Sequence, residues 1–253
     1  MNIQGKVAIV TGGSQGIGRG MTEALLNRGA SVVIADIKDG TAVVQELNSK
    51  YRKNVVIYQK CDVTKTSDNK ACINTAIREF GRFDILVNNA GVGGTSFWDD
   101  QDLNKAHFTI DVDLIAVMDF TRLAVQHWNK DPNSKGSVVN VASNMAFFPA
   151  GYDPIYGAAK AAVVHFTSTC ASLFPKIKVN AVAPNYAATE MYLKATELSN
   201  VTNVANMNGV LTIDEVVAQM VRCIEDPQLF GDTIKLIANK EPLVHKQRKA
   251  ARL

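Results

Sequence analysis

The chain has only four cysteines in 253 residues, and none of them falls in a CxxC pair or another spacing typical of a metal site. It has no apolar run long enough to cross a membrane, no internal repeat and no low-complexity segment. Scattered cysteines in a chain of this size are typical of reduced thiols. We therefore expect a cytoplasmic protein with no membrane span and no metal.

Outside the C-terminal end, neither positive nor negative charge is in clear excess. The formal net charge is +3, but residues 240–253 carry +4 by themselves, which leaves the remainder at −1. A body so close to neutral has no basic face for nucleic acid, so we expect no such partner. The basic tail ends in Ala251-Arg252-Leu253, which resembles a variant of the peroxisomal address; the alternative is a solvated chain end.

What the sequence has instead is a regular alternation of short apolar runs and helical patterns, with no linker between them. This alternation predicts one α/β domain over residues 1–253, and 47% apolar residues can fill a large core. The predicted strands are residues 7–10, 31–35, 55–58, 85–87, 138–142, 178–182 and 233–237.

Three later segments have distinct patterns. Residues 103–129 form one long helical pattern that is apolar on more than one side, as in a helix buried against a sheet or a partner subunit. Residues 186–211 are polar and weakly patterned, and their length predicts a substrate lid. A helix over 212–226 is expected to begin with a capping box made by Thr212 and Glu215.

A glycine-rich turn, TGGSQGIG at residues 11–18, joins the first predicted strand to the first helix. Glycines let the backbone approach a phosphate closely, and the helix N-terminus supplies free N–H groups and a positive dipole end. The strand before it and the helix after it are the required context. The turn therefore predicts a nucleotide phosphate site, the alternative being an ordinary glycine-rich turn.

Polar residues follow the next predicted strands. Asp36 ends the second strand, where a carboxylate can bind both ribose hydroxyls and repel a 2′-phosphate, which favours NAD over NADP; Lys38 nearby weakens that exclusion. Asp62 either caps the following turn or meets the adenine amino group, and the sequence favours the cap. Residues 88–91 (NNAG) suit the ligand-binding carboxyl edge of a parallel sheet, or a plain turn.

Tyr156 and Lys160 are four residues apart in a helical pattern, so they lie on one face. The pKa of a phenol is near ~10, and a base near neutral pH needs it lowered by about 3 units. A lysine cation nearby acts in that direction. Ser143, after the fifth strand, could hold a substrate oxygen against the phenol. Alone, this spacing also occurs by chance on helix surfaces.

Together these motifs make the chain resemble the short-chain dehydrogenase/reductase family over nearly all of residues 5–240. The matching segments are TGGSQGIG at 11–18, CDV at 61–63, NNAG at 88–91, and Ser143 thirteen residues before YGAAK. Within the family the chain is most similar to the NAD-dependent 15-hydroxyprostaglandin dehydrogenase group, through GKVAIVTGGSQGIGRG, FGRFDILVNNAGV and IEDPQLFGDTIKL.

The resemblance implies a single-domain Rossmann fold with a doubly wound, seven-stranded parallel sheet and helices on both faces. It implies hydride transfer between NAD(H) and a secondary alcohol or ketone, with Tyr156 as acid/base, Lys160 on the nicotinamide ribose lowering the tyrosine pKa, and Ser143 orienting the substrate oxygen. The cofactor-binding residues expected from the motifs and the resemblance are Gly12, Ser14, Gln15, Gly16, Ile17, Gly18, Asp36, Ile37, Asp62, Val63, Asn89, Ala90, Gly91, Tyr156, Lys160, Pro184, Ala187 and Thr189.

Three positions depart from the family pattern. Asp113, expected as a fourth catalytic residue, stands where the family has an asparagine in its proton path, so its charge is expected to retune Lys160 or weaken that relay. Asn185 replaces the usual glycine after Pro184, and asparagine tolerates a left-handed backbone. Asp153 replaces the glutamine that meets the substrate hydroxyl in the prostaglandin group, which makes the reaction class a firmer prediction than that substrate.

We expect a lipophilic substrate and a homodimer or homotetramer, the oligomer being a family expectation. One alternative is an NADPH-dependent carbonyl reductase, against which Asp36 argues. The other is a catalytically weakened NAD(H)-binding protein with an interaction role, supported only by Asp113 and Asp153. The apolar residues that could wall the substrate, or equally pack in the core or an interface, are Trp98, Met145, Phe147, Phe148, Pro149 and Tyr192.

Overall fold

A computed structural model describes residues 1–93, 98, 103–149, 151, 153–196 and 209–246, and the account below is confined to them. The chain forms one eight-stranded sheet in the order β3-β2-β1-β4-β5-β6-β7-β8. Its first seven strands are parallel, as predicted, and β8 pairs antiparallel with β7. The strands are β1 Val7–Thr11, β2 Ser31–Asp36, β3 Val56–Lys60, β4 Ile85–Asn88, β5 Gly136–Val141, β6 Ile177–Pro184, β7 Thr233–Leu236 and β8 Leu243–His245.

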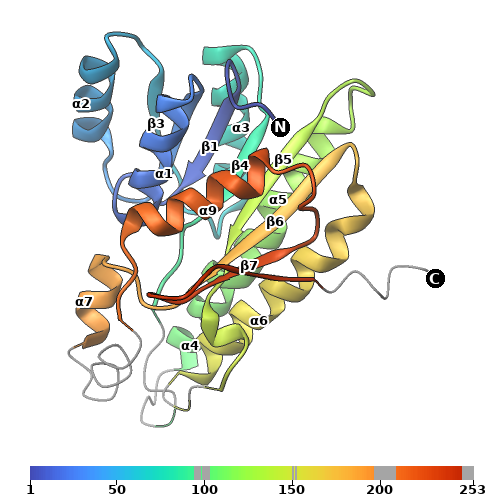
Figure 1. The fold of residues 1–253 in the computed structure, drawn as a ribbon. Coiled ribbons are helices and arrows are strands. Elements are labelled where there is room, and N and C mark those ends of the chain that lie inside the picture. Colours follow the sequence, from blue (N-terminus) through green and yellow to red (C-terminus); the bar gives the residue numbers. More distant parts are fainter. Residues whose placement is uncertain (94–97, 99–102, 150, 152, 197–208, 247–253) are drawn as a thin grey trace.

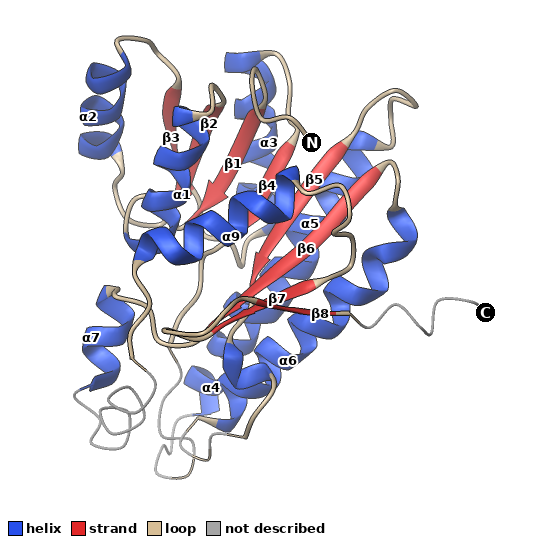
Figure 2. Ribbon diagram, in the orientation of Figure 1, coloured by secondary structure: helices blue, strands red, loops and turns tan. Residues whose placement is uncertain are grey.

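Helices cover both faces of the sheet (Figures 1 and 2). Alternate residues of β1 point to opposite faces: Ala8 and Val10 join one apolar cluster with α1, α2 and α9, while Val7 and Ile9 join another with α3 and α5. A smaller cluster packs α6 on the sheet. The helices are α1 Gly16–Asn27, α2 Thr41–Tyr51, α3 Thr66–Phe80, α4 Leu103–Ile110, α5 Ala116–Trp128, α6 Pro154–Thr169, α7 Glu190–Thr196 and α9 Ile213–Glu225.

The structure corrects three sequence predictions. The sheet has an eighth strand, because β8 is only three residues long and has too little pattern to be recognised. The single helix expected over 103–129 is divided into α4, a π-helical segment η1 (Asp111–Ile115) and α5. The segment 186–211, for which the weak pattern predicted no particular element, contains α7.

Some predictions fall on residues outside the described set. Residues 197–208, nearly half of the expected lid, and 247–253, which include the address-like Ala251-Arg252-Leu253, lie there. Among the described helices, none combines the length and apolar character needed to cross a membrane. In the same described ranges, no group of three or more His, Cys, Asp or Glu side chains is placed to hold a metal.

Candidate active site

The glycine-rich turn is tied to the end of β4 by hydrogen bonds. The Asn89 amide donates to the carbonyl oxygens of Thr11 (2.9 Å) and Gly12 (3.3 Å). The Thr11 hydroxyl accepts from the backbone N–H groups of Asn89 and Ala90, both at 2.9 Å. A Cβ at Gly18 would lie 2.1 Å from the Gly12 oxygen, so only glycine fits there. These contacts fix the turn at the carboxyl edge of the sheet.

The start of α1 offers backbone donors to a ligand. Its N-cap residue, Gln15, makes no side-chain capping bond, and the first turn contains no acidic residue. Gly16, at φ 53°, begins the helix in a left-handed conformation that glycine adopts without strain. Such an uncapped N-terminus suits an anionic group.

Asp36 lies beside this turn at the end of β2. Its Oδ2 accepts from the Ser14 N–H at 3.1 Å and from the Ser14 hydroxyl, while Oδ1 accepts from the Lys38 N–H at 3.0 Å. The Lys38 ammonium reaches Gln15 Oε1 at 2.9 Å and Glu190 Oε2 at 3.3 Å. The cation that weakened the predicted exclusion of NADP is therefore paired with a carboxylate from α7.

Asp62 has the capping role that the sequence favoured. Its Oδ1 accepts from the N–H and the hydroxyl of Thr64, at 3.1 and 2.7 Å, and Lys65 Nζ lies 3.3 Å from Oδ2. The Thr64 hydroxyl bond is the main cause that lowers the pKa of Asp62. The carboxylate thus closes the turn before α3.

Three of the four predicted catalytic residues, all but Asp113, come from two neighbouring segments after β5. Ser143 is the N-cap of a short 3-10 turn, η2 (Asn144–Ala146), and its hydroxyl accepts from the Met145 N–H at 3.2 Å. Tyr156 lies in the first turn of α6, whose N-cap Asp153 accepts from the Tyr156 N–H at 3.2 Å. Lys160 follows one turn later, with Nζ 5.4 Å from the centre of the Tyr156 ring.

Lys160 is held from the opposite side by Asp113. Its Nζ lies 3.3 Å from Asp113 Oδ1 and 3.1 Å from the Val141 carbonyl oxygen. Asp113 has no exposed surface and Lys160 only 3%. Asp113 belongs to η1, and π-helical turns are frequent at functional sites.

The surroundings of Tyr156 raise its pKa, whereas the sequence predicted that Lys160 would lower it. Burial of the hydroxyl is the largest cause that raises the Tyr156 pKa above its ordinary value, and the nearby Asp113 carboxylate adds to it. A hydrogen bond with Ser143 acts in the lowering direction, and Asp153 raises the pKa further. The expectation that Lys160 lowers this pKa is thus outweighed, first by burial and then by the Asp113 charge next to the same ammonium.

The remaining predicted cofactor residues also lie at this edge. Thr189 Cγ2 would be 3.5 Å from a Cβ at Gly16, which places the start of α7 beside the glycine turn. A Cβ at Gly91 would lie 2.8 Å from Asp113 Oδ1. Ile37 is 61% exposed, Ala187 is buried, and Ile17, Val63 and Ala90 are half-buried. Pro184 ends β6.

Among the described residues, Asn185 is not one of those with positive φ, so its turn does not need the left-handed backbone that we expected.

The predicted apolar walls divide into two kinds. Phe148 is 37% exposed and Trp98 73%, and the Trp98 indole N–H donates to the Gly151 oxygen at 2.9 Å. Phe147 instead packs edge-on against His245 of β8, with ring centres 4.9 Å apart, and Lys235 Nζ lies 4.4 Å from its centre. The first kind can meet a ligand, whereas Phe147 takes part in packing.

Two polar contacts of the site could not be found from the sequence. Glu190 reaches Lys38 across 152 residues of chain. Asn140 links β4 to α6: it accepts from the Asn88 amide at 2.9 Å and donates to the Thr167 hydroxyl at 3.0 Å. No local pattern marks either residue, because both partners are distant in the sequence.

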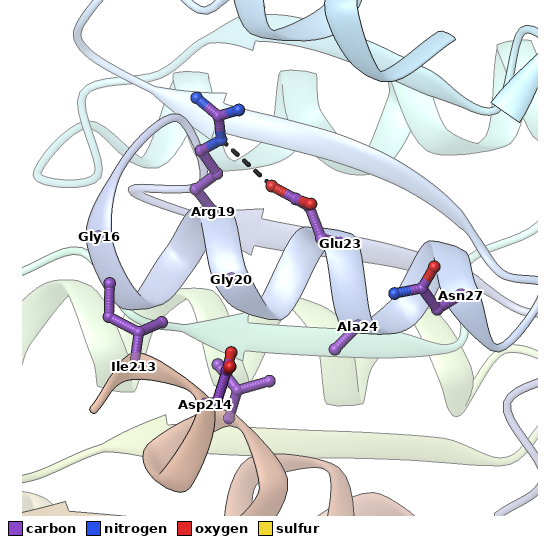
Figure 3. Close-up of a pocket in the computed structure, with 9 residues that line it drawn as sticks. Gly16, Arg19, Gly20, Glu23, Ala24, Asn27, Ile213 and Asp214 are labelled. Atoms are coloured by element: carbon purple, nitrogen blue, oxygen red, sulfur yellow. Dashed lines mark hydrogen bonds and ion pairs between the residues drawn. The ribbon is translucent and has the colours of Figure 1, made fainter. Parts of the chain in front are cut away.

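A groove lies between α1 and α9, with Gly16 of the glycine-rich turn in its lining (Figure 3). Its volume is about 420 Å³, and one wall carries the Arg19–Glu23 ion pair at 3.3 Å. None of Ser143, Tyr156 or Lys160 lines it. We place the chemistry at the carboxyl edge instead, where the titratable groups converge.

Comparison with known proteins decides the family. A family model described as short chain dehydrogenase matches residues 6–199. The chain belongs to the short-chain dehydrogenase family. As a short-chain dehydrogenase it is an oxidoreductase with a Rossmann fold, and the resemblance found in its motifs is confirmed.

Several relatives are similar along most of the chain. The rat (Rattus norvegicus) 15-hydroxyprostaglandin dehydrogenase [NAD(+)] is 27% identical, covering 95% of this chain and 94% of that protein. A mitochondrial borneol dehydrogenase of Lavandula x intermedia is 35% identical over 75% of this chain and 72% of that protein. A crystal structure of 3-ketoacyl-(acyl-carrier-protein) reductase from Brucella melitensis complexed with NADH has a TM-score of 0.83 and 26% identity, covering 94% and 98% of the two chains. Two of these names agree with the predicted nicotinamide cofactor.

Proposed function

We propose that this short-chain dehydrogenase transfers a hydride between NAD(H) and a secondary alcohol or ketone of lipophilic character. The observation that carries the proposal is the convergence of Ser143, Tyr156 and Lys160 at the same edge of the sheet as the glycine-rich turn. This edge, at the carboxyl ends of parallel strands, is where ligands bind in open α/β sheets.

The residues of the turn fit a dinucleotide. Gly18 leaves the backbone free to approach a diphosphate, and the uncapped start of α1 presents N–H donors to it. The Asp36 carboxylate, only 6% exposed, suits the ribose hydroxyls and disfavours a 2′-phosphate. Bound NAD supplies the hydride acceptor for oxidation, and NADH the donor for reduction.

The protein's own residues handle the proton and the substrate oxygen. In oxidation, the Tyr156 phenolate takes the hydroxyl proton as the C–H hydride leaves for NAD, giving the ketone, NADH and a protonated Tyr156. The Ser143 hydroxyl donates to the substrate oxygen and keeps it against the phenol. Lys160 supports the phenolate through its charge. Reduction runs through the same steps in reverse.

Substrate character is supported by the site and the relatives. The exposed apolar Trp98, Phe148 and Met191 favour a lipophilic ligand. The names of the borneol and hydroxyprostaglandin dehydrogenases favour an alcohol. Asp153, which caps α6 where the prostaglandin group has a glutamine, argues against a prostaglandin itself.

We also propose a homodimer or homotetramer. Phe108, Ile115 and Met118, on consecutive segments α4, η1 and α5, are 52%, 50% and 40% exposed, and an apolar surface of this kind is suited to a second subunit. Light scattering coupled to size exclusion should give two or four times the 27.4 kDa chain mass, and a single-chain mass would contradict this.

The test is NADH formation from NAD at an alkaline pH with secondary alcohols, hydroxy fatty acids and hydroxysteroids, with NADP in parallel. Tyr156→Phe should abolish turnover. Tyr51→Phe, which removes an α2 hydroxyl bonded to Asn27 of α1, should keep it. NADH binding without turnover on any alcohol would favour a non-catalytic NAD(H)-binding protein, a role that the buried Asp113 beside Lys160 supports. Preference for NADP would favour the carbonyl reductase.

A further inference from the structure

The Asp113 carboxylate is held in an unusual way for a fully buried acid. Its Oδ1 accepts from Lys160 Nζ at 3.3 Å and from the Val92 N–H at 3.1 Å. Its Oδ2 is also buried, and in the described part of the structure it has no hydrogen-bond partner. A half-satisfied buried carboxylate is costly, so its presence next to the catalytic lysine calls for a role.

The surroundings confine this carboxylate to the lysine. Gly91 lies against Oδ1 so closely that a Cβ there would be 2.8 Å away. The Lys160 ammonium, 3% exposed, is bonded to Asp113 and to the Val141 carbonyl oxygen at 3.1 Å, and lies 5.4 Å from the Tyr156 ring centre. Burial raises the pKa of the Asp113 carboxyl, and Lys160 acts in the lowering direction. In its ionised form Asp113 offsets much of the positive field of Lys160 at the phenol, because the two groups are in direct contact.

We propose that Asp113 is a positioning residue that binds the Lys160 ammonium and keeps Tyr156 protonated at neutral pH, which moves the pH midpoints of alcohol oxidation and carbonyl reduction to alkaline pH. The inference rests on the proposed function for its catalytic consequence. The protonated phenol is the acid that reduction needs, and the phenolate is the base that oxidation needs. Both profiles therefore report the ionisation of Tyr156.

Several charged groups lie around Tyr156, and among them Asp113 has the largest effect on the Tyr156 pKa. Asp153, at the start of α6, acts in the same direction as Asp113 on the phenol, and the Ser143 hydroxyl of the η2 turn acts in the opposite one. Lys105 and His107, on α4, which packs against α6, are exposed to solvent. Burial and the Asp113 charge are the two largest causes of the raised Tyr156 pKa, and only the charge can be removed by a near-isosteric substitution.

The experiment titrates Tyr156 in the protein without cofactor, by the ultraviolet absorbance of tyrosinate. Each protein is measured with and without Tyr156→Phe, so that the difference isolates this residue among the six tyrosines. Asp113→Asn should lower the Tyr156 midpoint by about one pH unit or more, the size expected when a neighbouring charge is removed. Asp111→Asn is the matched control, because Asp111 belongs to the same π-helical segment but is exposed, and it should change nothing.

The pH profiles of kcat/KM give the second readout. In Asp113→Asn, the midpoints of oxidation and reduction should move down by the same amount as the tyrosinate titration. An unchanged titration overturns the inference even if the enzyme turns over alcohols through Tyr156. A shifted titration without turnover on any alcohol supports the electrostatic role and contradicts the proposed function. If the asparagine variant does not fold, Asp113→Ser removes the charge with a smaller side chain and is read in the same way.

Discussion

The Asp36 carboxylate accepts hydrogen bonds from both the backbone N–H, at 3.1 Å, and the hydroxyl of Ser14. This contact joins the tip of β2 to the glycine-rich turn after β1, so the acid is fixed beside the backbone that we assign to the cofactor diphosphate. Because Asp36 is 6% exposed, its charge is little screened by solvent.

Asp36→Asn is expected to raise the ratio of kcat/KM for NADP to that for NAD by at least about tenfold, equivalent to about 1.4 kcal/mol. The amide keeps the shape but removes the charge that repels a 2′-phosphate, and Lys38 remains close by. Steady-state kinetics with both cofactors measure the ratio. Asp39→Asn is the control, since Asp39 is an exposed acid of the same loop bonded to the Thr41 N–H. An unchanged ratio in Asp36→Asn would contradict the assignment of Asp36.

Much of the fold could be read from the sequence because parallel strands buried on both faces leave strong apolar runs. All seven predicted strands lie within two residues of the observed ones at either end. β8 was missed because three residues paired antiparallel to β7 carry almost no pattern. The break at η1 was missed because the segment is apolar on several sides, so an extra residue in one turn leaves no visible change of period.

The candidate site was predictable where its residues are close in sequence and not where they are far apart. The spacing of Tyr156 and Lys160 places them on one face of α6, as a helix of that period requires. The pairing of Lys160 with Asp113 joins residues 47 apart, and the Asp113 charge adds to burial, the largest cause of the raised Tyr156 pKa. The pKa of a buried group depends on charges that are close in space but distant in the sequence, and no local pattern in the sequence reveals them.

Gly136→Ala is expected to destabilise the fold by about 1–3 kcal/mol through overpacking. A Cβ at Gly136 would lie 2.1 Å from the Trp128 ring, which is fully buried and donates its N–H to the Phe83 oxygen at 2.7 Å. Chemical denaturation measures the loss. Gly151→Ala, at a position where an added Cβ meets no described residue within 4 Å, should leave stability unchanged. Equal stability of the two variants would contradict this packing.

Glu215→Gln is expected to lower Tm at neutral pH, with the difference from wild type vanishing in acid. Glu215 completes the predicted capping box: it accepts from the Thr212 N–H at 2.7 Å, and the Thr212 hydroxyl accepts from the Glu215 N–H at 3.2 Å. The bonds that the Glu215 carboxylate accepts, first from the Thr212 N–H and then from the Thr212 hydroxyl at 2.8 Å, lower the Glu215 pKa below its ordinary 4.5. A depressed carboxyl pKa contributes stability above the unfolded value, which is lost as pH falls through the folded value.

Thermal unfolding from pH 7 downward through the carboxyl range measures this difference. Asp214→Asn is the control, because Asp214 is an exposed acid in the same first turn of α9. Its charge also favours the helix N-terminus, so the control separates the capping bonds from the dipole effect. A Tm difference for Glu215→Gln that persisted unchanged in acid would show that the carboxylate charge is not responsible.

Asn89→Ala is expected to weaken NADH binding about tenfold. The Asn89 amide donates to the Thr11 and Gly12 oxygens, and two lost hydrogen bonds of about 1 kcal/mol each would release the turn that approaches the diphosphate. NADH fluorescence titration measures Kd, and Tm reports the fold.

Asn48→Ala is the matched control, because Asn48 also ties backbone groups together, but at the amino end of β3. It donates to the Val56 oxygen and accepts from the N–H groups of Val55 and Val56. It should lower Tm without changing Kd, because the opposite edge of a parallel sheet does not meet the ligand. Equal Kd changes in both variants would mean that general destabilisation, rather than the position of the turn, controls NADH affinity.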